Sequence, residues 1–206
     1  MHTSKVNVQH LTELALLIAL VLVLAYTPLG YLPIGPLSLS LITIPVAIGA
    51  MILGPASGAV LGTVFGLTSF MNAMQGGSVM GTALFNANPV FCFINCVVAR
   101  LLCGWLCGVI YAALKKAMPG KKKLCCTLGA LSAPVLNTIF FMGFLVLLFY
   151  QTEYVQSLVA SLGAVNPFVF VVMLVGLQGL IEAAVCCVVA TAVTVPLLTV
   201  LNRVKT

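Results

Sequence analysis

Acidic and catalytic side chains are scarce in this sequence of 206 residues, which contains no aspartate, three glutamates and two histidines. Enzymes that work inside a membrane need paired acids, a histidine, or a nucleophile with a base beside it. Both histidines, His2 and His10, lie before the first long apolar stretch. We therefore expect that the protein is not an enzyme, in particular not a lipid-modifying transferase or a protease.

Two ligand-binding motifs are also missing. The phosphate loop Gly-x-x-x-x-Gly-Lys-[Ser/Thr] does not occur, so no nucleotide or other cofactor is expected in this chain. The eight cysteines include no Cys-x-x-Cys pair with zinc-site spacing, so no metal site is predicted. Four cysteines would share one face of a regular α-helix, where thiols pack as small apolar groups: Cys92, Cys96, Cys103 and Cys107.

Charged residues make up 6% of the chain and hydrophobic residues 62%, whereas a soluble domain carries about 25% charged residues. A stretch of about 20 apolar residues crosses a bilayer as a helix. We therefore predict an all-α polytopic membrane protein, in which residues 1–206 form one transmembrane domain of six helices. The predicted spans cover residues 11–27, 41–53, 58–71, 90–114, 124–150 and 167–201.

Basic residues are confined to three regions, apart from Arg100. They comprise Lys5, the loop lysines Lys115, Lys116, Lys121, Lys122 and Lys123, and the C-terminal Arg203 and Lys205. The positive-inside rule predicts that this loop and both termini are cytoplasmic. Because the lysine run has this topological explanation, no nucleic-acid partner is expected.

Three other connections would then lie on the outer side, at residues 28–40, 72–89 and 151–166. The first is apolar but contains three prolines and two glycines, which exclude a regular helix. Irregular backbone is not tolerated against lipid, so this segment must lie at the surface or cover a cavity in the protein. We expect it to act as an occluding lid.

Arg100 is the only basic residue inside a predicted span. At a helical rise of about 1.5 Å per residue, Arg100 and Asn137 both lie roughly 20 Å from the inner boundary. A charge at this depth must face a cavity or a partner. We predict an outward-facing cavity whose polar lining binds the substrate through Arg100, Asn137, Glu182, Gln178, Asn95 and Asn72.

Two structural alternatives apply to the same residues. Glu182 could neutralise Arg100, which would make the two a buried ion pair rather than a ligand site. Asn137 and Thr138 could form only an interhelical hydrogen bond.

Several motifs occur in order along the chain. They are Ala15-x-x-x-Ala19, Ile44-Pro-Val-Ala-Ile-Gly-Ala-Met-Ile-Leu-Gly-Pro55, Gly58-x-x-x-Gly62-x-x-x-Gly66-Leu-Thr-Ser-Phe70, Ala99-Arg-Leu-Leu-Cys-Gly104 and Asn137-Thr-Ile-Phe-Phe-Met-Gly143. With these motifs, nearly the whole chain resembles the S component, the substrate-binding membrane subunit, of energy-coupling factor (ECF) vitamin transporters. It is most similar to the pantothenate and riboflavin types, although its cysteine-rich fourth span and Leu131-Ser-Ala-Pro134 differ from both.

The resemblance implies a six-helix subunit of the bacterial plasma membrane that captures a vitamin from outside. It also implies partners: a transmembrane coupling subunit, docked on the face with Ala15 and Ala19, and two ATPase subunits that hydrolyse the ATP. The S component would topple in the membrane to release its substrate. A stand-alone transporter is the alternative, but the first three and last three spans show no internal repeat.

The two vitamin types make different demands on the cavity. The carboxylate of pantothenate would suit Arg100, with Glu182 nearer the hydroxyl-bearing end. Riboflavin has no carboxylate, so Arg100 would then serve a ring carbonyl or pair with Glu182.

Overall fold

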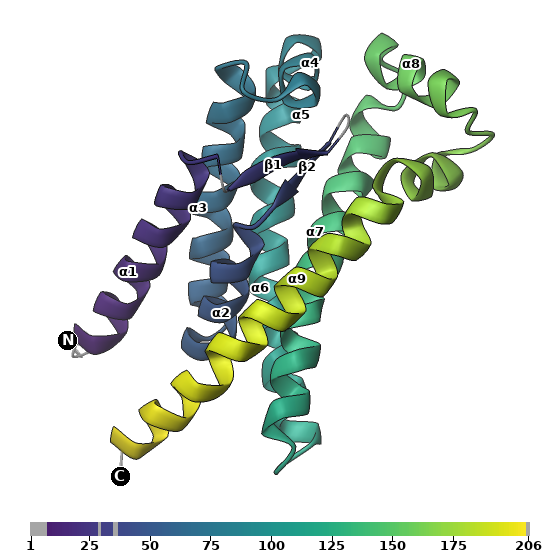
Figure 1. Cartoon of the computed structure of the whole chain (residues 1–206). Helices are drawn as coiled ribbons and strands as arrows, with labels where there is room; N and C mark the ends of the chain where they lie inside the picture. The colour runs from purple at the N-terminus through teal and green to yellow at the C-terminus, as the bar shows by residue number, and fades with distance from the viewer. Residues whose placement is uncertain (1–7, 29, 35–36, 205–206) are drawn as a thin grey trace, which may run out of the picture.

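Helices form nearly all of the regular structure in the computed structural model, which describes residues 8–28, 30–34 and 37–204 (Figure 1). In chain order the elements are α1 (Val8–Ala25), β1 (Tyr31–Ile34), β2 (Leu37–Ser40), α2 (Thr43–Leu53), α3 (Pro55–Met74), α4 (Val79–Ala87), α5 (Pro89–Phe93), the π-helix η1 (Ile94–Val98), α6 (Ala99–Ala117), α7 (Lys122–Phe149), α8 (Glu153–Leu162) and α9 (Pro167–Val204). The predicted all-α membrane bundle is confirmed, since each of the six predicted spans overlaps helical residues, and only residues 26–27, 41–42 and 150 of them lie outside the helices.

Four helical segments are long and apolar enough to cross a membrane: Val8–Ala25, Pro89–Ala117, Lys122–Phe149 and Gln178–Thr199. Helix α8 and the start of α9 form a bent pair, at 76°, that would make a fifth span. Helix α2 has only 11 residues, but eight of them are buried, so protein rather than lipid surrounds it. Helix α3 has 20 residues, so the predicted range 58–71 was too short at both ends.

The three outer connections contain more regular structure than their sequences suggested. Strands β1 and β2 form an antiparallel hairpin in which Tyr31 pairs with Ser40. The second connection contains α4, which begins where the hydroxyl of Ser78 accepts a hydrogen bond from the Gly81 N–H at 3.2 Å. The third contains α8, whose Val155 is fully buried. The prolines exclude a helix from the first connection, as expected, but they do not prevent a short hairpin.

The predicted glycine face of α3 packs directly against α6. A Cβ atom added at Gly58 would overlap the carbonyl of Gly104, and one added at Gly62 would overlap the carbonyl of Arg100. At Gly66 it would lie 2.6 Å from the Cα atom of Val97. The two backbones therefore touch along a seam that includes Arg100, which only glycine permits.

The fourth span is not a uniform α-helix. Residues 94–98 form a π turn, in which hydrogen bonds run from residue i to i+5 and the following side chains are rotated relative to an α-helix. As a result, Cys96 lies 4.0 Å from the Ser69 hydroxyl on α3, whereas Cys103 lies 3.2 Å from the Ala133 carbonyl oxygen on α7. The four cysteines of this span are all buried, but the prediction that they share one face was wrong.

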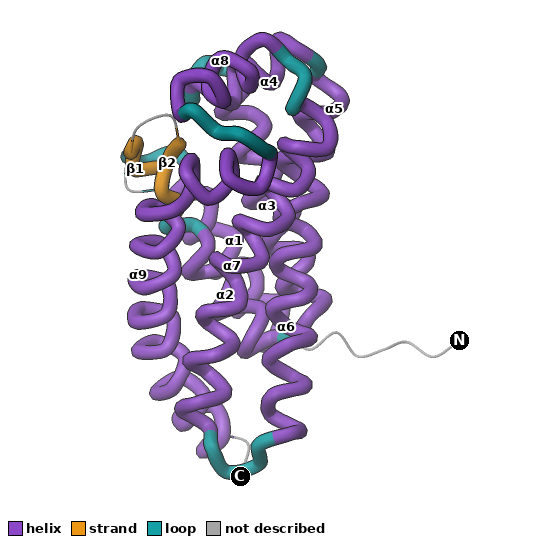
Figure 2. Tube along the Cα trace, turned by 90° about the vertical axis from the view of Figure 1, so that its right-hand side faces the viewer, coloured by secondary structure: helices purple, strands orange, loops and turns teal. Residues whose placement is uncertain are grey.

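The basic regions gather toward one end of the bundle. The start of α1, the end of α9 and the turn between α6 and α7 lie toward that end, while the hairpin, α4 and α8 lie at the other (Figures 1 and 2). This arrangement agrees with the one-sided charge distribution, and the cytoplasmic location of that end stays a prediction. His2, Lys5 and Lys205 lie outside the described residues.

Candidate binding cavity

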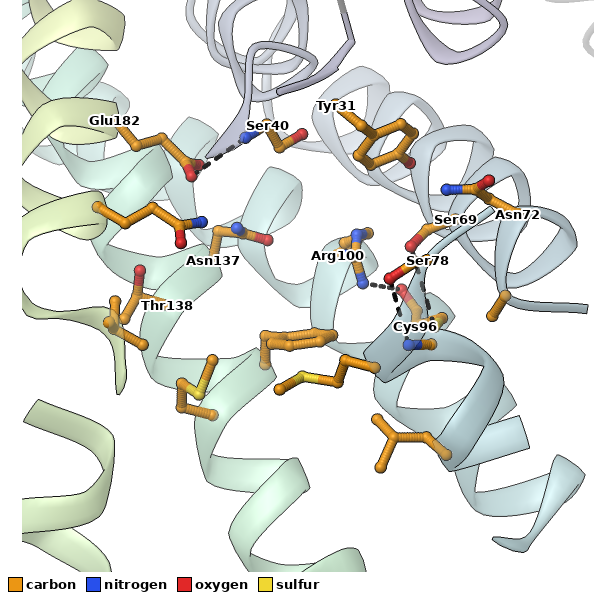
Figure 3. Close-up of a pocket in the computed structure, with 18 of the residues that line it drawn as sticks. Tyr31, Ser40, Ser69, Asn72, Ser78, Cys96, Arg100, Asn137, Thr138 and Glu182 are labelled. Carbon is orange, nitrogen blue, oxygen red and sulfur yellow. Dashed lines mark hydrogen bonds between the residues drawn. The ribbon is translucent and has the colours of Figure 1, made fainter. Parts of the chain in front are cut away.

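A cavity of about 100 Å³ lies among the hairpin, α3, α4, the fourth span, α7 and α9. The cavity lies in the half of the bundle that contains the hairpin, and Figure 3 shows side chains that line it. The polar residues of its wall are Tyr31, Ser40, Ser69, Asn72, Ser78, Arg100, Asn137, Thr138, Gln178 and Glu182. Polar side chains from four helices, the residue that precedes α4 and the hairpin therefore converge on one small space inside an apolar bundle.

Five of the six residues predicted from the sequence to bind substrate line this cavity: Asn72, Arg100, Asn137, Gln178 and Glu182. The sixth, Asn95, is fully buried but does not line it. Asn95 is five residues before Arg100, about 140° from it around a regular α-helix at about 100° per residue, so the height that Asn95 shares with Arg100 did not place it on the cavity face. That the five lining residues bind a substrate stays a prediction.

Arg100 is held by one hydrogen bond and two aromatic rings. Its Nη1 donates to the Cys96 carbonyl oxygen at 3.0 Å. Its guanidinium carbon lies 4.6 Å from the ring centroid of Phe65 and 5.0 Å from that of Phe141. Rings at these distances attract a cation through their π faces, and they also restrict where the guanidinium can turn. Nε is buried and has no hydrogen-bond partner.

Glu182 bonds to the base of the hairpin rather than to Arg100. Its Oε2 accepts a hydrogen bond from the Ser40 N–H at 3.4 Å. The Thr43 hydroxyl lies 3.5 Å from Oε1, but its single proton has a nearer acceptor in the Ser40 carbonyl oxygen at 2.8 Å. Within the part of the chain that the structure describes, Arg100 and Glu182 form no salt bridge. The two side chains therefore do not form the direct ion pair of the structural alternative, and their role in binding a ligand stays a prediction.

Four buried polar atoms in the cavity wall lack a hydrogen-bond partner: Tyr31 Oη, Ser40 Oγ, Arg100 Nε and Asn137 Oδ1. An unpaired polar group in a protein interior costs about 1–3 kcal/mol, so buried groups of this kind are normally satisfied. Here they surround a cavity of about 100 Å³, which has room for water-sized molecules. The cavity wall thus presents donors and acceptors to whatever occupies it.

Sequence reasoning missed several lining residues because they come from connections whose structure it did not resolve. Tyr31 and Ser40 belong to the hairpin, and Ser78 is the N-cap of α4. The only sequence signal for them was their place in uncharged outer connections. Phe141 was also missed, although it lies four residues after Asn137 and so on the same face of α7.

The alanines predicted to dock a partner lie away from the cavity. Ala15 and Ala19 are exposed on α1, which forms an edge of the bundle (Figure 1). Only Val21 of this helix is buried, because α1 packs against α2 and α3 through one narrow face. The face with the two alanines is therefore open to another molecule.

Among the described residues, no three histidine, cysteine or acidic side chains are grouped so that they could hold a metal ion. All eight cysteines are free thiols.

Comparison with known families gives a match over most of the chain. The family described as "ECF transporter, substrate-specific component" matches residues 9–194. No curated protein matches the sequence.

Proposed function

Because the chain belongs to the family of ECF transporter substrate-specific components, we propose that it captures a water-soluble vitamin in the cavity around Arg100, and that the vitamin is pantothenate. Family membership makes the protein a multi-pass membrane protein and a transporter subunit rather than an enzyme. It also implies a small substrate and a partner ECF module, which uses the ATP.

The observation that supports a carboxylate-bearing substrate is the state of Arg100. Its guanidinium lines the cavity, has no carboxylate partner in the described chain, and has an unpaired Nε. Nη1 is already bonded to the Cys96 carbonyl oxygen, so an anion is expected to approach along the Nε edge. Two N–H groups on that edge match the two oxygens of a carboxylate, which arginine binds bidentately.

The rest of the wall suits the other groups of pantothenate. Asn137 and Gln178 can exchange hydrogen bonds with an amide, and Asn137 Oδ1 is free to accept one. Glu182 accepts hydrogen bonds and would repel a carboxylate, so the hydroxyl-bearing end belongs on its side. Riboflavin or another vitamin is the alternative substrate; riboflavin has no carboxylate and would leave the charge of Arg100 uncompensated.

The size of the cavity requires a movement on binding. Sites for drug-sized ligands have volumes of about 300–1,000 Å³, and this cavity has about 100 Å³. The hairpin contributes Tyr31 and Ser40 to the wall and is held to α9 by the long contact between Ser40 and Glu182. We propose that the hairpin is the lid, and that it moves outward to admit the vitamin.

Delivery inward would depend on partners. A transmembrane coupling subunit would pack on the exposed face of α1 with Ala15 and Ala19, and two ATPase subunits would drive the cycle. Small side chains at this spacing permit close approach of a second helix in a membrane. Toppling of the S component would then release the vitamin, with no cofactor in this chain.

The test is a binding titration of the purified full chain in lipid nanodiscs with pantothenate, riboflavin and other water-soluble vitamins. Pantothenate should bind, and Arg100→Lys should weaken binding by at least about tenfold, because lysine keeps the charge but loses the bidentate geometry. Arg203→Lys, at the far end of α9, is the matched control and should bind normally. Binding of riboflavin but not pantothenate, or normal affinity of folded Arg100→Lys, would contradict the proposal.

A further inference from the structure

Pro134 interrupts the backbone hydrogen bonding of α7 close to the cavity. Proline has no N–H group, so Pro134 cannot donate to the carbonyl oxygen of Ala130 one turn earlier. Ala130 is fully buried. Inside a membrane no water replaces the missing donor, and an unsatisfied carbonyl there is costly.

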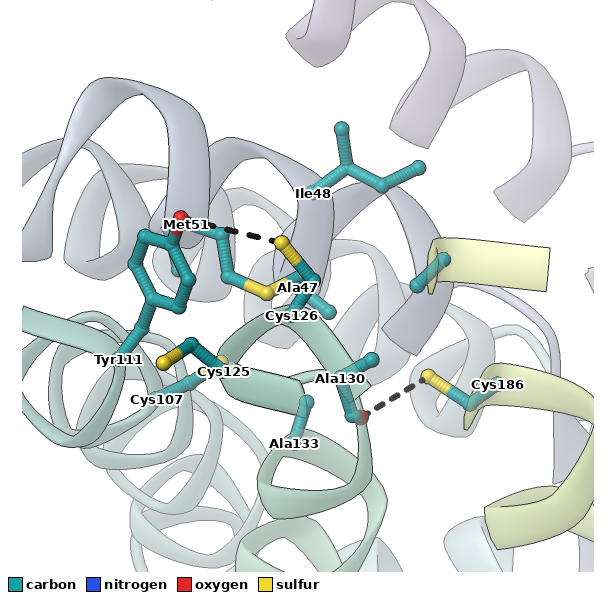
Figure 4. Packing of buried hydrophobic residues seen from close by; sticks show 12 residues of the cluster. Ala47, Ile48, Met51, Cys107, Tyr111, Cys125, Cys126, Ala130, Ala133 and Cys186 are labelled. Atoms are coloured by element: carbon teal, nitrogen blue, oxygen red, sulfur yellow. Dashed lines mark hydrogen bonds between the residues drawn. The ribbon is translucent and has the colours of Figure 1, made fainter. Parts of the chain in front are cut away.

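A cysteine on the neighbouring helix supplies a donor to this carbonyl. The Sγ atom of Cys186 on α9 lies 3.6 Å from the Ala130 carbonyl oxygen (Figure 4). Cys186 is 1% exposed, and it packs in the same apolar cluster as Ala130. A thiol is a weak donor, but this contact serves a carbonyl to which Pro134 cannot donate.

Other thiol contacts on α7 differ in this respect. Cys107 Sγ lies 3.5 Å from the Gly129 carbonyl oxygen, and Cys187 Sγ lies 3.8 Å from that of Thr127. The residues one turn after these carbonyls are Ala133 and Leu131, which both have an N–H group. Only the thiol at Cys186 therefore compensates for a proline.

The contact lies immediately below two cavity residues. On α9, Gln178, Glu182 and Cys186 are four residues apart and so lie along one face. On α7, Asn137 is three residues after Pro134 and on the same side of that helix. Helices α7 and α9 pack closely along their length. The contact at this level thus joins the face of α9 that carries Gln178 and Glu182 to the part of α7 just before Asn137.

We propose that Cys186 is a positioning residue: its hydrogen bond to the carbonyl freed by Pro134 sets the rotation and spacing of α9 against α7, and thereby fixes where Glu182 and Gln178 lie relative to Asn137 in the cavity wall. The effect on vitamin affinity rests on the proposed function. The effect on Glu182 itself does not, and it can be measured without any ligand.

The ligand-free test uses infrared spectroscopy of the full chain in nanodiscs. The chain has three acidic residues and no aspartate, so a Glu182→Gln difference spectrum assigns the carboxyl band of Glu182. Cys186→Ala should shift this band, and Cys186→Ser, which restores a donor, should return it. The S–H stretching band that is lost in Cys186→Ala belongs to Cys186. In the wild-type protein this band should have the lowered frequency of a hydrogen-bonded thiol. Cys187→Ala is the matched control and should leave the Glu182 band unchanged.

A double-mutant cycle tests the link to Pro134. Pro134→Ala restores a backbone N–H for the Ala130 carbonyl, so Cys186→Ala should have a smaller effect on the Glu182 band in this background. In vitamin titrations well below the melting temperature, Cys186→Ala should lower affinity about fivefold in the wild-type background. In the Pro134→Ala background it should lower affinity less than about twofold.

Three results would overturn the inference. The first is a Glu182 carboxyl band that does not shift in Cys186→Ala, and the second is a Cys186 S–H band at the frequency of a free thiol. The third is an effect of Cys186→Ala that is equally large in the wild-type and Pro134→Ala proteins. A shifted band in a protein that binds no vitamin would instead uphold the positioning of Glu182 and refute the proposed function. The two failures are therefore distinguishable.

Discussion

Replacement of Gly62 by alanine should destabilise the protein and weaken substrate binding, because the new methyl group would overlap the backbone carbonyl of Arg100. This glycine lies on the seam where α3 and α6 touch. The obstacle is a backbone atom rather than the end of a flexible side chain. The overlap can be relieved only if the two helices separate at the level of the cavity.

The size of the effect follows from two losses. Forcing an extra carbon into a packed interior costs about 1–3 kcal/mol. Phe65 is on the same helix, three residues after Gly62, and its ring centroid lies 4.6 Å from the guanidinium carbon of Arg100. Separation of the helices would weaken this cation–π contact, worth about 0.5–2 kcal/mol. We therefore expect a loss of about 1–5 kcal/mol in the free energy of unfolding and roughly tenfold weaker vitamin binding.

The assay is detergent-induced unfolding together with vitamin titration, both on the full chain. Gly143→Ala is the matched control, because it makes the same change within a helix at a site with no atom within 4 Å of the added Cβ. Alanine is favoured over glycine in a helix by about 1 kcal/mol, so this control should be neutral or stabilising. If Gly62→Ala is as stable as Gly143→Ala and binds normally, the close contact between the α3 and α6 backbones is refuted.

Three further predictions concern other parts of the chain. The double variant Ala15→Trp with Ala19→Trp should abolish uptake by cells while the isolated subunit still binds the vitamin, because large side chains on the exposed face of α1 block a partner helix. Equal loss of uptake and binding would instead mean that these alanines are needed for folding. Asn95→Leu should bind normally and be more stable by about 1 kcal/mol or more, because it removes a buried amide whose Oδ1 and Nδ2 have no partner; loss of binding by the folded variant would return Asn95 to the binding site. A reporter fused within Lys115–Lys123 should register as cytoplasmic, and an external signal would invert the topology.

Local composition and periodicity were enough to predict the membrane bundle. Long apolar stretches can cross a bilayer only as helices, since the backbone must satisfy its own hydrogen bonds there. The spacing of Gly58, Gly62 and Gly66 likewise predicted a smooth helix face, because residues four apart lie on one side. The depth of Arg100 and Asn137 placed both near one level, and the structure puts both in the cavity wall.

The sequence by itself thus determined the class of protein, the membrane-spanning helices and half of the polar residues of the cavity, because these depend on hydrophobicity and regular spacing. Only the tertiary structure decided that Arg100 and Glu182 form no direct ion pair, that residues 94–98 form a π turn, and that Cys186 reaches the carbonyl freed by Pro134. The first and last depend on how separate helices are rotated against each other. The π turn changes the hydrogen-bond register within one helix, and the 3.6-residue period assumed for the sequence does not reveal it.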